Sequence, residues 1–375
     1  MPRPPNSPTD HTLLSLMVCV FAVFLVTGAA LPALPLHIHG DLGFGTFAVG
    51  LVSGAQFGAA LLCRLWSGTV SGRRGPKFAV TTGLAALAGT LYLVSLLALG
   101  RPLLSIAILI AGRVLLGGAE SFVMIGAQSW FLSLGGGGNV GKMIAWIGTA
   151  MFMALALGAP LGSALLVHFG FASIGRATLI GAVGTWLLVV SIPAIHRAPQ
   201  SRKATGHVLK AVWIPSLAMA FSSVGYGVMT AFGVLLFVEH GAVLYRLRRG
   251  ADDGTGVLRP IAGPPRGART AMVFVVIQSV GMALIWLSPY AWLALAGSAM
   301  AGFGYALVYS GLGIEAVARA PAEARGLAMG VYTAFIDLAL GLLAPLLGLL
   351  ANGIGLSRIF LVTALLALCT LPIAA

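Results

Sequence analysis

The sequence predicts an all-α polytopic membrane protein, and three properties of the chain predict this fold class. Of its 375 residues, 59% are hydrophobic and 8% are charged, whereas a soluble domain carries about 25% charged residues. Its mean hydropathy is +1.00. Apolar segments of roughly the 20 residues that span a bilayer recur along the chain, and they lack the short alternating pattern of outer-membrane barrel strands. We therefore predict helices packed side by side in a membrane.

Eleven apolar segments are predicted to be clear transmembrane helices. Their approximate ranges are 12–36, 44–67, 78–99, 103–132, 143–168, 174–194, 212–238, 271–288, 291–314, 326–350 and 356–375. The polar and basic segment 196–211 is predicted to be a cytoplasmic linker between a first half, residues 1–195, and a second half, residues 212–375.

Segment 241–269 departs from this pattern. The alternation of loops between the two sides requires a further helix, the eighth, between residues 240 and 270. The stretch 242–267 carries seven charged residues and three prolines, and burying those charges in a bilayer would cost more than roughly 10 kcal/mol. Two explanations remain open: a compensated pair of frameshifts in the gene, or a divergent insertion. The nucleotide sequence of this region would distinguish them.

The basic charge of the chain indicates a membrane orientation. The net charge is +13, and most Lys and Arg residues fall in loops on one predicted side, as the positive-inside rule requires. The N-terminus is therefore predicted to be cytoplasmic, and nucleic acid is not an expected partner. Cys19, Cys63 and Cys369 lie in apolar runs, so no disulfide or metal site is expected. The chain has no P-loop and no catalytic constellation, so neither an enzyme nor a cofactor is predicted.

A short basic stretch lies between the second and third predicted helices, at residues 68–77. Its pattern is Gly68-x-Val70-x-x-Arg73-x-Gly75-x-Lys77, which resembles the loop signature G-x-L-x-D-R-x-G-R-R/K of the major facilitator superfamily. The resemblance implies a gating loop at this place. Gly72 stands where the signature has Asp, which puts the cytoplasmic gate of the family in doubt here.

Arg113 and Glu120 are candidate residues of a substrate or proton pathway. They lie seven residues apart in the fourth predicted helix, so they share nearly the same face, about two turns apart. Charged side chains inside a bilayer are costly and usually face a polar cavity or a partner. The alternative is a structural charge that a neighbouring helix satisfies. The arrangement Arg113 to Gly117 also resembles the superfamily's R-x-x-x-G pattern.

The fifth predicted helix carries a motif of small residues, Gly158-Ala-Pro160-Leu-Gly162. Glycines allow two backbones to approach closely, and proline bends a helix. The motif resembles the superfamily's G-P-x-x-G pattern, which is associated with drug/proton antiporters, although Ala159 here separates Gly from Pro. The alternative is ordinary packing of small residues.

Asp337 is the only acidic residue well inside a predicted helix of the second half. An isolated carboxylate in a membrane is protonated unless it is paired or hydrated. Asp337 is therefore a candidate for a proton site or for a gating pair with a cation; the alternative is a hydrogen-bonded structural residue. Further polar candidates for the pathway are Gln56, Gln128 and Tyr305.

Taken whole, the chain resembles a major facilitator superfamily transporter over nearly its full length. The stretches Leu34–Phe47 and Gly326–Gly341 particularly resemble the bacterial YhhS/YfcJ-like branch. The resemblance implies two six-helix bundles around a midplane cavity and alternating access. It further implies a monomer in the bacterial cytoplasmic membrane that exports a small organic solute, sugar or drug-like, by proton antiport. The alternative from another class is a non-transporting membrane protein, either a sensor or an inactive remnant.

Overall fold

A computed structural model describes residues 10–83, 101–135, 140–192, 205–239, 267–288, 290–321 and 325–374. Within these ranges the regular secondary structure is entirely helical. Nine of the described helices are long and apolar enough to cross a membrane, and a shorter apolar helix covers Ala271–Leu287. The predicted class, an all-α polytopic membrane protein, is confirmed.

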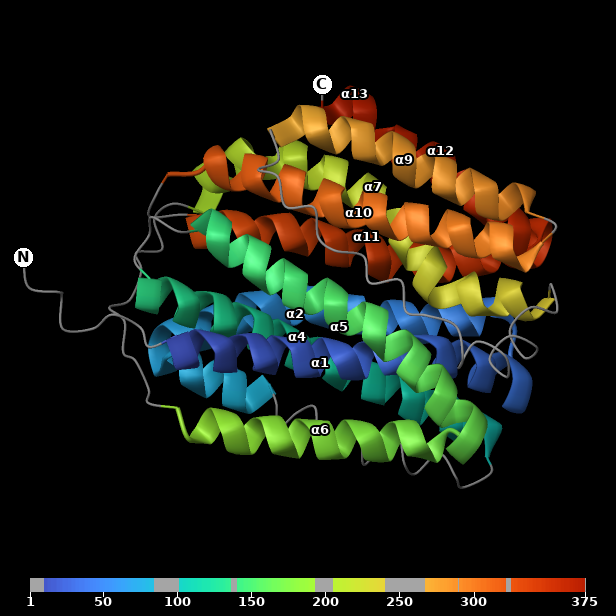
Figure 1. Ribbon diagram of the computed structural model, residues 1–375, viewed down its shortest axis with the longest axis horizontal. Helices are drawn as coiled ribbons and strands as arrows, with labels where there is room; N and C mark the ends of the chain where they lie inside the picture. The colour runs from blue at the N-terminus through green and yellow to red at the C-terminus, as the bar shows by residue number, and fades with distance from the viewer. Residues whose placement is uncertain are drawn as a thin grey trace, which may run out of the picture.

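The helices form two groups that follow each other in the chain (Figure 1). The first group comprises α1 (Asp10–Leu36), the π-helical turn η1 (His37–Asp41), α2 (Thr46–Arg74), α4 (Pro102–Gly135), α5 (Val140–Phe169) and α6 (Ala172–Val190). The second comprises α7 (Thr205–Glu239), α9 (Gly267–Leu287), α10 (Ala291–Ala318), α11 (Arg325–Ile354), α12 (Leu356–Leu368) and α13 (Thr370–Ala374).

Packing within each group is extensive. In the first group α1 packs against α5, α6 and α4, and α2 packs against α4. In the second group α9 packs against α10 and α12, while α7 packs against α10, α11 and α12. The two groups meet mainly through α2 and α11, with further contacts from α1 to α7 and from α5 to α10.

One predicted boundary changes. Helix α7 begins at Thr205, so the last residues of the predicted linker 196–211 belong to a helix. Most of the third predicted helix, residues 84–100, lies outside the described residues. The same is true of most of the anomalous segment 241–269, since only its last residues, from Gly267 onward, are described, as the start of α9.

The basic stretch 68–77 was expected to be a loop, and this expectation was wrong, because most of the stretch is helical. Helix α2 continues to Arg74 and is broken only at Gly75, whose φ of 90° is one that side-chain-bearing residues rarely adopt. Pro76 then opens a new helical segment, a position that suits proline. Glycine inside a helix costs about 1 kcal/mol and does not forbid it, so Gly68 and Gly72 remain helical.

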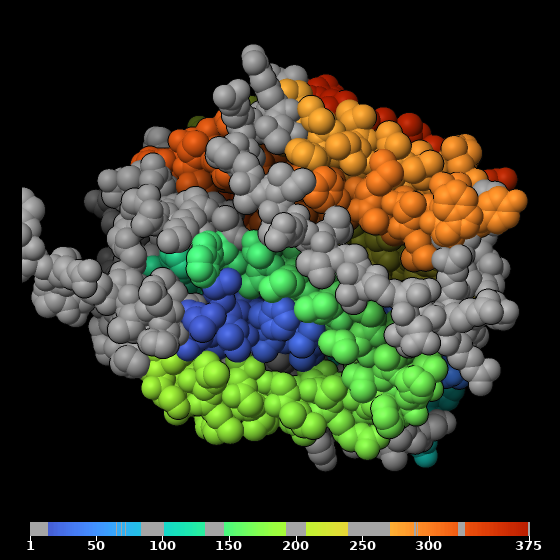
Figure 2. Space-filling view, in the orientation of Figure 1, coloured from blue at the N-terminus to red at the C-terminus, as the bar shows by residue number. Residues whose placement is uncertain are grey.

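The outer surface of the bundle is strongly apolar. Leu62, Leu103 and Ile180, for example, are each more than 70% exposed. Extensive exposed apolar surface marks a region that contacts a membrane or another protein. Figure 2 shows one face of the bundle, with α6 at the lower edge, α9 and α10 at the upper edge, and α1 and α5 between them.

A seam of small residues joins the two groups. Gly50 and Gly54 of α2 lie so close to α11 that an added Cβ would come within 2.3 Å of the Ala344 carbonyl oxygen and 2.8 Å of the Gly341 carbonyl oxygen, respectively. At one end of the seam the Thr46 hydroxyl donates a hydrogen bond of 2.8 Å to the Gly348 carbonyl. Close backbone packing of this kind is typical of membrane helices, where small residues replace bulky side chains at the contact.

Candidate functional site

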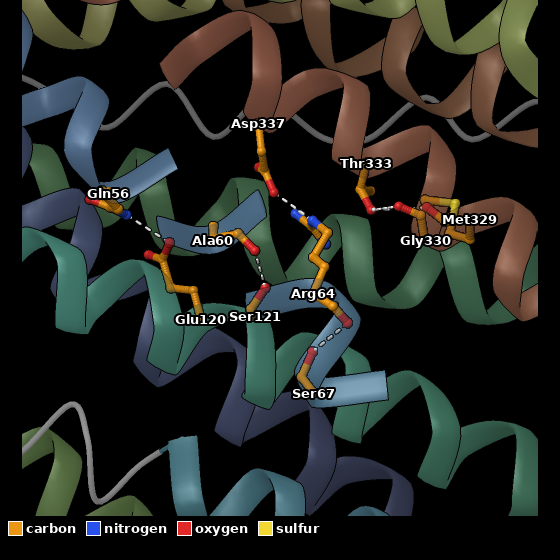
Figure 3. A network of polar contacts seen from close by, with 10 residues as sticks. All are labelled: Gln56, Ala60, Arg64, Ser67, Glu120, Ser121, Met329, Gly330, Thr333 and Asp337. Carbon is orange, nitrogen blue, oxygen red and sulfur yellow. Dashed lines mark hydrogen bonds and ion pairs between the residues drawn. The ribbon is translucent and has the colours of Figure 1, made fainter. Parts of the chain in front are cut away.

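Two polar side chains of α2, Gln56 and Arg64, lie on one face of that helix. Gln56, Ala60 and Arg64 are four residues apart and therefore lie on the same side of the helix. Figure 3 shows the carboxylate of Glu120, on α4, meeting Gln56, and the carboxylate of Asp337, on α11, meeting Arg64. The two acidic residues are within electrostatic range of each other, so the structure brings these groups into one site.

Glu120 is held by two neighbours. Its side chain is 7% exposed, and Gln56 donates a hydrogen bond of 2.6 Å from Nε2 to its Oε2. The Thr27 hydroxyl of α1 donates to Oε1. The same hydroxyl lies 3.1 Å from the Val23 carbonyl, so it can instead donate there and accept a hydrogen bond from a protonated Glu120. The surroundings therefore offer hydrogen-bond partners to both the charged and the neutral carboxyl group.

Arg113 is buried without equivalent partners. It is 4% exposed. Among the described residues, neither Nε nor Nη1 of its guanidinium has a hydrogen-bond partner. Glu120 and the Tyr226 hydroxyl, on α7, are within electrostatic range of it. Buried polar groups are normally hydrogen-bonded, and one that is not calls for an explanation such as a ligand or a water.

Arg64 and Asp337 form an ion pair between the two groups of helices. The distance from Arg64 Nε to Asp337 Oδ2 is 2.5 Å, and the two side chains are 13% and 8% exposed. Asp337 was expected to serve as a proton site, as a gating partner of a cation or as a structural residue. The structure pairs it with a cation of the other group, and a role in gating stays a prediction. Arg64 Nη1 is buried without a hydrogen-bond partner among the described residues.

Aromatic side chains surround the centre of the site from the second group. Tyr226 of α7 and Tyr305 of α10 stack with ring centroids 4.8 Å apart and planes 5° apart. Phe152 of α5 meets the edges of Tyr305 and Tyr309, at 6.0 and 5.5 Å. Tyr305 thus lies at the contact between the two groups. Gln128, the remaining candidate, is also buried.

The motif in α5 lies against α1. A Cβ on Gly162 would come within 2.0 Å of the Ala29 carbonyl oxygen, and one on Gly158 within 2.5 Å of the Leu25 carbonyl oxygen. Pro160 lies inside the same helix. The two glycines therefore allow the backbones of α5 and α1 to approach closely, which is the packing alternative; a role in antiport stays a prediction.

Gly162→Ala is expected to lower the stability of the protein by about 1–3 kcal/mol, the usual cost of forcing extra atoms into a packed contact. Gly148→Ala, in the same helix, is the matched control, because an added Cβ there would meet only the Tyr309 ring at an ordinary 3.9 Å. Thermal unfolding of the purified protein in detergent measures both. Equal unfolding temperatures for the two variants would contradict the close approach of α5 to α1.

The basic segment anchors the end of the first group. Lys77 Nζ donates to the carbonyls of Val190 and Ile192, at 2.7 and 2.5 Å, and so ties α6 to the segment after α2. Arg73 is exposed. The proposed gating residues Gly68, Arg73, Gly75 and Lys77 therefore sit at one end of the bundle, and their role in gating stays a prediction.

Sequence reasoning missed three members of the site. Arg64 had a signal, because it shares a helix face with Gln56, but its partner is in the other half of the chain. Tyr226 was one of several tyrosines in predicted membrane helices, and no sequence feature distinguished it from the others. No sequence feature indicated Thr27, because a hydroxyl in an apolar helix usually forms a hydrogen bond with the backbone of its own helix.

Comparison with known proteins assigns this chain to a family. The family model of the Major Facilitator Superfamily matches residues 16–251. The chain belongs to the Major Facilitator Superfamily. This confirms the resemblance of the sequence motifs and makes the chain a multi-pass membrane protein of a transporter family, not of an enzyme family.

Relatives cover the chain almost from end to end. An uncharacterised MFS-type transporter of Salmonella typhimurium is 34% identical over 98% of this chain and 97% of its own length. The MFS-type transporter YhhS of Escherichia coli is 33% identical over 97% of this chain and 93% of its own length. The crystal structure of the human organic anion transporter MFSD10 has a TM-score of 0.69 at 16% identity and full coverage of both chains; at that identity the likeness concerns the fold alone.

Proposed function

We propose that this superfamily member is a proton-coupled secondary transporter that exports a small organic solute, sugar or drug-like, by alternating access between its two halves. The observation that carries the proposal is the setting of Glu120. A carboxyl group that is buried and has partners for both its charged and its neutral form can take up and release a proton without losing its hydrogen bonds.

The ion pair between the halves supplies the conformational part of the proposal. Arg64 and Asp337 hold α2 against α11 in this structure. The two halves must separate on one side of the membrane in each transport cycle. An ion pair is suited to that step if each residue can exchange its partner for another one when the halves separate. We propose Asp337 as the gating carboxylate and Glu120 as the proton carrier.

Orientation and direction are part of the same proposal. The end of the bundle that carries Arg73, Arg74 and Arg325 is proposed to be cytoplasmic, because basic residues stay on that side; the N-terminus then lies there too. The membrane would be the bacterial cytoplasmic membrane, and the working unit a monomer. The motif in α5 resembles that of antiporters, so we propose that solute leaves in exchange for entering protons.

Glu120→Gln is expected to remove proton coupling, because the amide keeps hydrogen bonds to Gln56 and Thr27 but cannot carry a proton. Proteoliposomes loaded with a pH-sensitive dye measure this. L-arabinose, ethidium and benzenesulfonate serve as neutral, cationic and anionic solutes. We expect at least one of them to make the lumen alkaline on entry with the unaltered protein, and none to do so with Glu120→Gln.

Glu315→Gln is the matched control for this experiment. Glu315 of α10 forms an exposed pair with Arg319, so its loss should leave the proton flux unchanged. Lumenal acidification in place of alkalinisation would show co-transport and contradict antiport. An unchanged proton flux in Glu120→Gln would contradict the role of Glu120.

A further inference from the structure

The charged side chains around Glu120 are divided between the two groups of helices. Glu120 of α4 and Arg64 of α2 belong to the first group, and Asp337 of α11 belongs to the second. Arg64 and Asp337 are paired across the contact of the two groups (Figure 3), and Asp337 acts electrostatically on Glu120. A separation of the two halves therefore changes the charge that Glu120 experiences.

Helices α2 and α4 pack backbone to backbone and form one unit. A Cβ on Gly117 of α4 would lie 1.9 Å from the Gln56 carbonyl oxygen of α2. One turn further along α2, the Ser121 hydroxyl donates a hydrogen bond of 2.7 Å to the Ala60 carbonyl. Helices in such close contact move together. The arginine of α2 and the glutamate of α4 therefore keep their separation when the two halves move.

Helix geometry gives the scale of that separation. Gln56, which donates to Glu120, lies about two turns from Arg64 on the same face of α2, or about 12 Å along the axis. Two charges at this distance in a protein change a proton affinity by about tenfold, or about one pH unit. While Asp337 neutralises Arg64, the effects of the two charges on Glu120 largely cancel. Once Asp337 leaves with α11, the positive charge of Arg64 stabilises the charged form of Glu120.

The other neighbours of Glu120 do not reverse this effect. Gln56 of α2 and Thr27 of α1 are uncharged donors of the same group of helices. Arg113 is on the same helix as Glu120 and stays with it. The Tyr226 hydroxyl, from α7 of the second group, is in electrostatic range but is uncharged near neutral pH. Among the described residues, the ion pair of α2 and α11 is thus the charged neighbour that changes when the halves separate.

We propose that the Arg64–Asp337 pair is linked to the proton on Glu120: the pair is closed while Glu120 carries the proton, and separation of the pair drives the release of that proton. The proton passes from the Glu120 carboxyl group to water that enters between the separating halves. Linkage is reciprocal, so loss of the proton favours separation by the same factor. This inference rests on the proposed function and adds the step that couples its proton carrier to its gate.

Infrared spectroscopy of the purified protein at a series of pH values measures the proton on Glu120. The carboxyl absorption that is missing in Glu120→Gln belongs to this residue, and its loss with rising pH gives a midpoint. Asp337→Asn leaves the charge of Arg64 uncompensated, so we expect a midpoint lower by about one pH unit. Arg64→Leu with Asp337→Leu removes both charges and should restore the midpoint of the unaltered protein.

Glu315→Gln is the control for the infrared titration. It removes an exposed carboxylate of α10 and should leave the midpoint of Glu120 unchanged.

The distance between α2 and α11 tests the linkage in the reverse direction, without any change to the pair. Spin labels at Arg74→Cys and Leu327→Cys, both exposed, report on the helix ends opposite to the contact of Thr46 with Gly348. In a background lacking the native cysteines, we expect the labels to move apart as the pH rises through the midpoint. In Glu120→Gln, whose side chain stays uncharged, they should remain close at every pH. This measurement decides the question even if Asp337→Asn does not fold.

Three outcomes would each overturn the linkage: an unchanged or raised midpoint in Asp337→Asn, a lowered midpoint that persists in the double variant, or a label distance that does not change with pH. None of them contradicts the proposed function, because proton flux in proteoliposomes tests Glu120 separately. A Glu120 absorption that does not change at any pH at which the protein is folded would instead contradict the proton carrier, and the linkage with it.

Discussion

Asp337→Ala is expected to destabilise the protein by about 3–5 kcal/mol, the cost of leaving one member of a buried ion pair without its partner. The Arg64 side chain is 13% exposed, and the substitution removes the carboxylate that neutralises it. Arg64 Nη1 already lacks a hydrogen-bond partner among the described residues. Thermal and denaturant unfolding in detergent micelles measure the loss.

A double substitution separates the pair from its members. Arg64→Leu with Asp337→Leu removes both charges, and replacing a buried pair by apolar side chains is often neutral, so most of the lost stability should return. The matched control is the exposed pair of Glu315 and Arg319, 30% and 38% exposed, where Glu315→Ala should change stability by at most about 1 kcal/mol. A double variant no more stable than Asp337→Ala would show that the two residues do not act as a pair.

The seam between α2 and α11 gives the second large effect. Gly50→Ala is expected to force the two halves apart at this point, because the new Cβ would lie 2.3 Å from the Ala344 carbonyl oxygen and 2.9 Å from its carbon. Backbone atoms cannot rotate out of the way as a flexible side chain can, so the helices must separate. We expect a loss of about 1–3 kcal/mol in stability and a wider gap between α2 and α11.

Cross-linking measures that gap directly. Thr46 and Asn352 are joined by a hydrogen bond of 2.6 Å, so a Thr46→Cys, Asn352→Cys pair in a background lacking the native cysteines should form a disulfide readily. Gly50→Ala should slow its formation strongly.

Gly58→Ala is the control for the seam, because an added Cβ at Gly58 meets nothing within 4 Å. Both substitutions make the same gain in helix propensity, about 1 kcal/mol. Gly58→Ala should therefore leave cross-linking unchanged. Equal cross-linking rates in Gly50→Ala and Gly58→Ala would mean that the halves do not pack through this seam.

Features that depend on neighbours along the chain could be read from the sequence. Hydropathy predicted the membrane helices, because roughly 20 apolar residues in a row have no stable place in water. The spacing of Arg113 and Glu120 placed them on one helix face, because the pitch of a helix is fixed. The end of α2 was misplaced, because glycine and arginine are frequent in loops, although Gly75 alone needs a backbone angle that breaks the helix.

Only the tertiary structure decided which of these groups meet. Arg64 pairs with Asp337, which is 273 residues away in the sequence, and Glu120 is bonded to Thr27, which is 93 residues away. Helical periodicity specifies which way a side chain points, but not which helix lies opposite, because that choice depends on how whole surfaces pack. The sequence by itself determined a membrane transporter with charged groups in its core. The packing of α1, α2, α4 and α11 determined that Glu120 and Asp337 are held by partners, while Nε and Nη1 of Arg113 have no hydrogen-bond partner among the described residues.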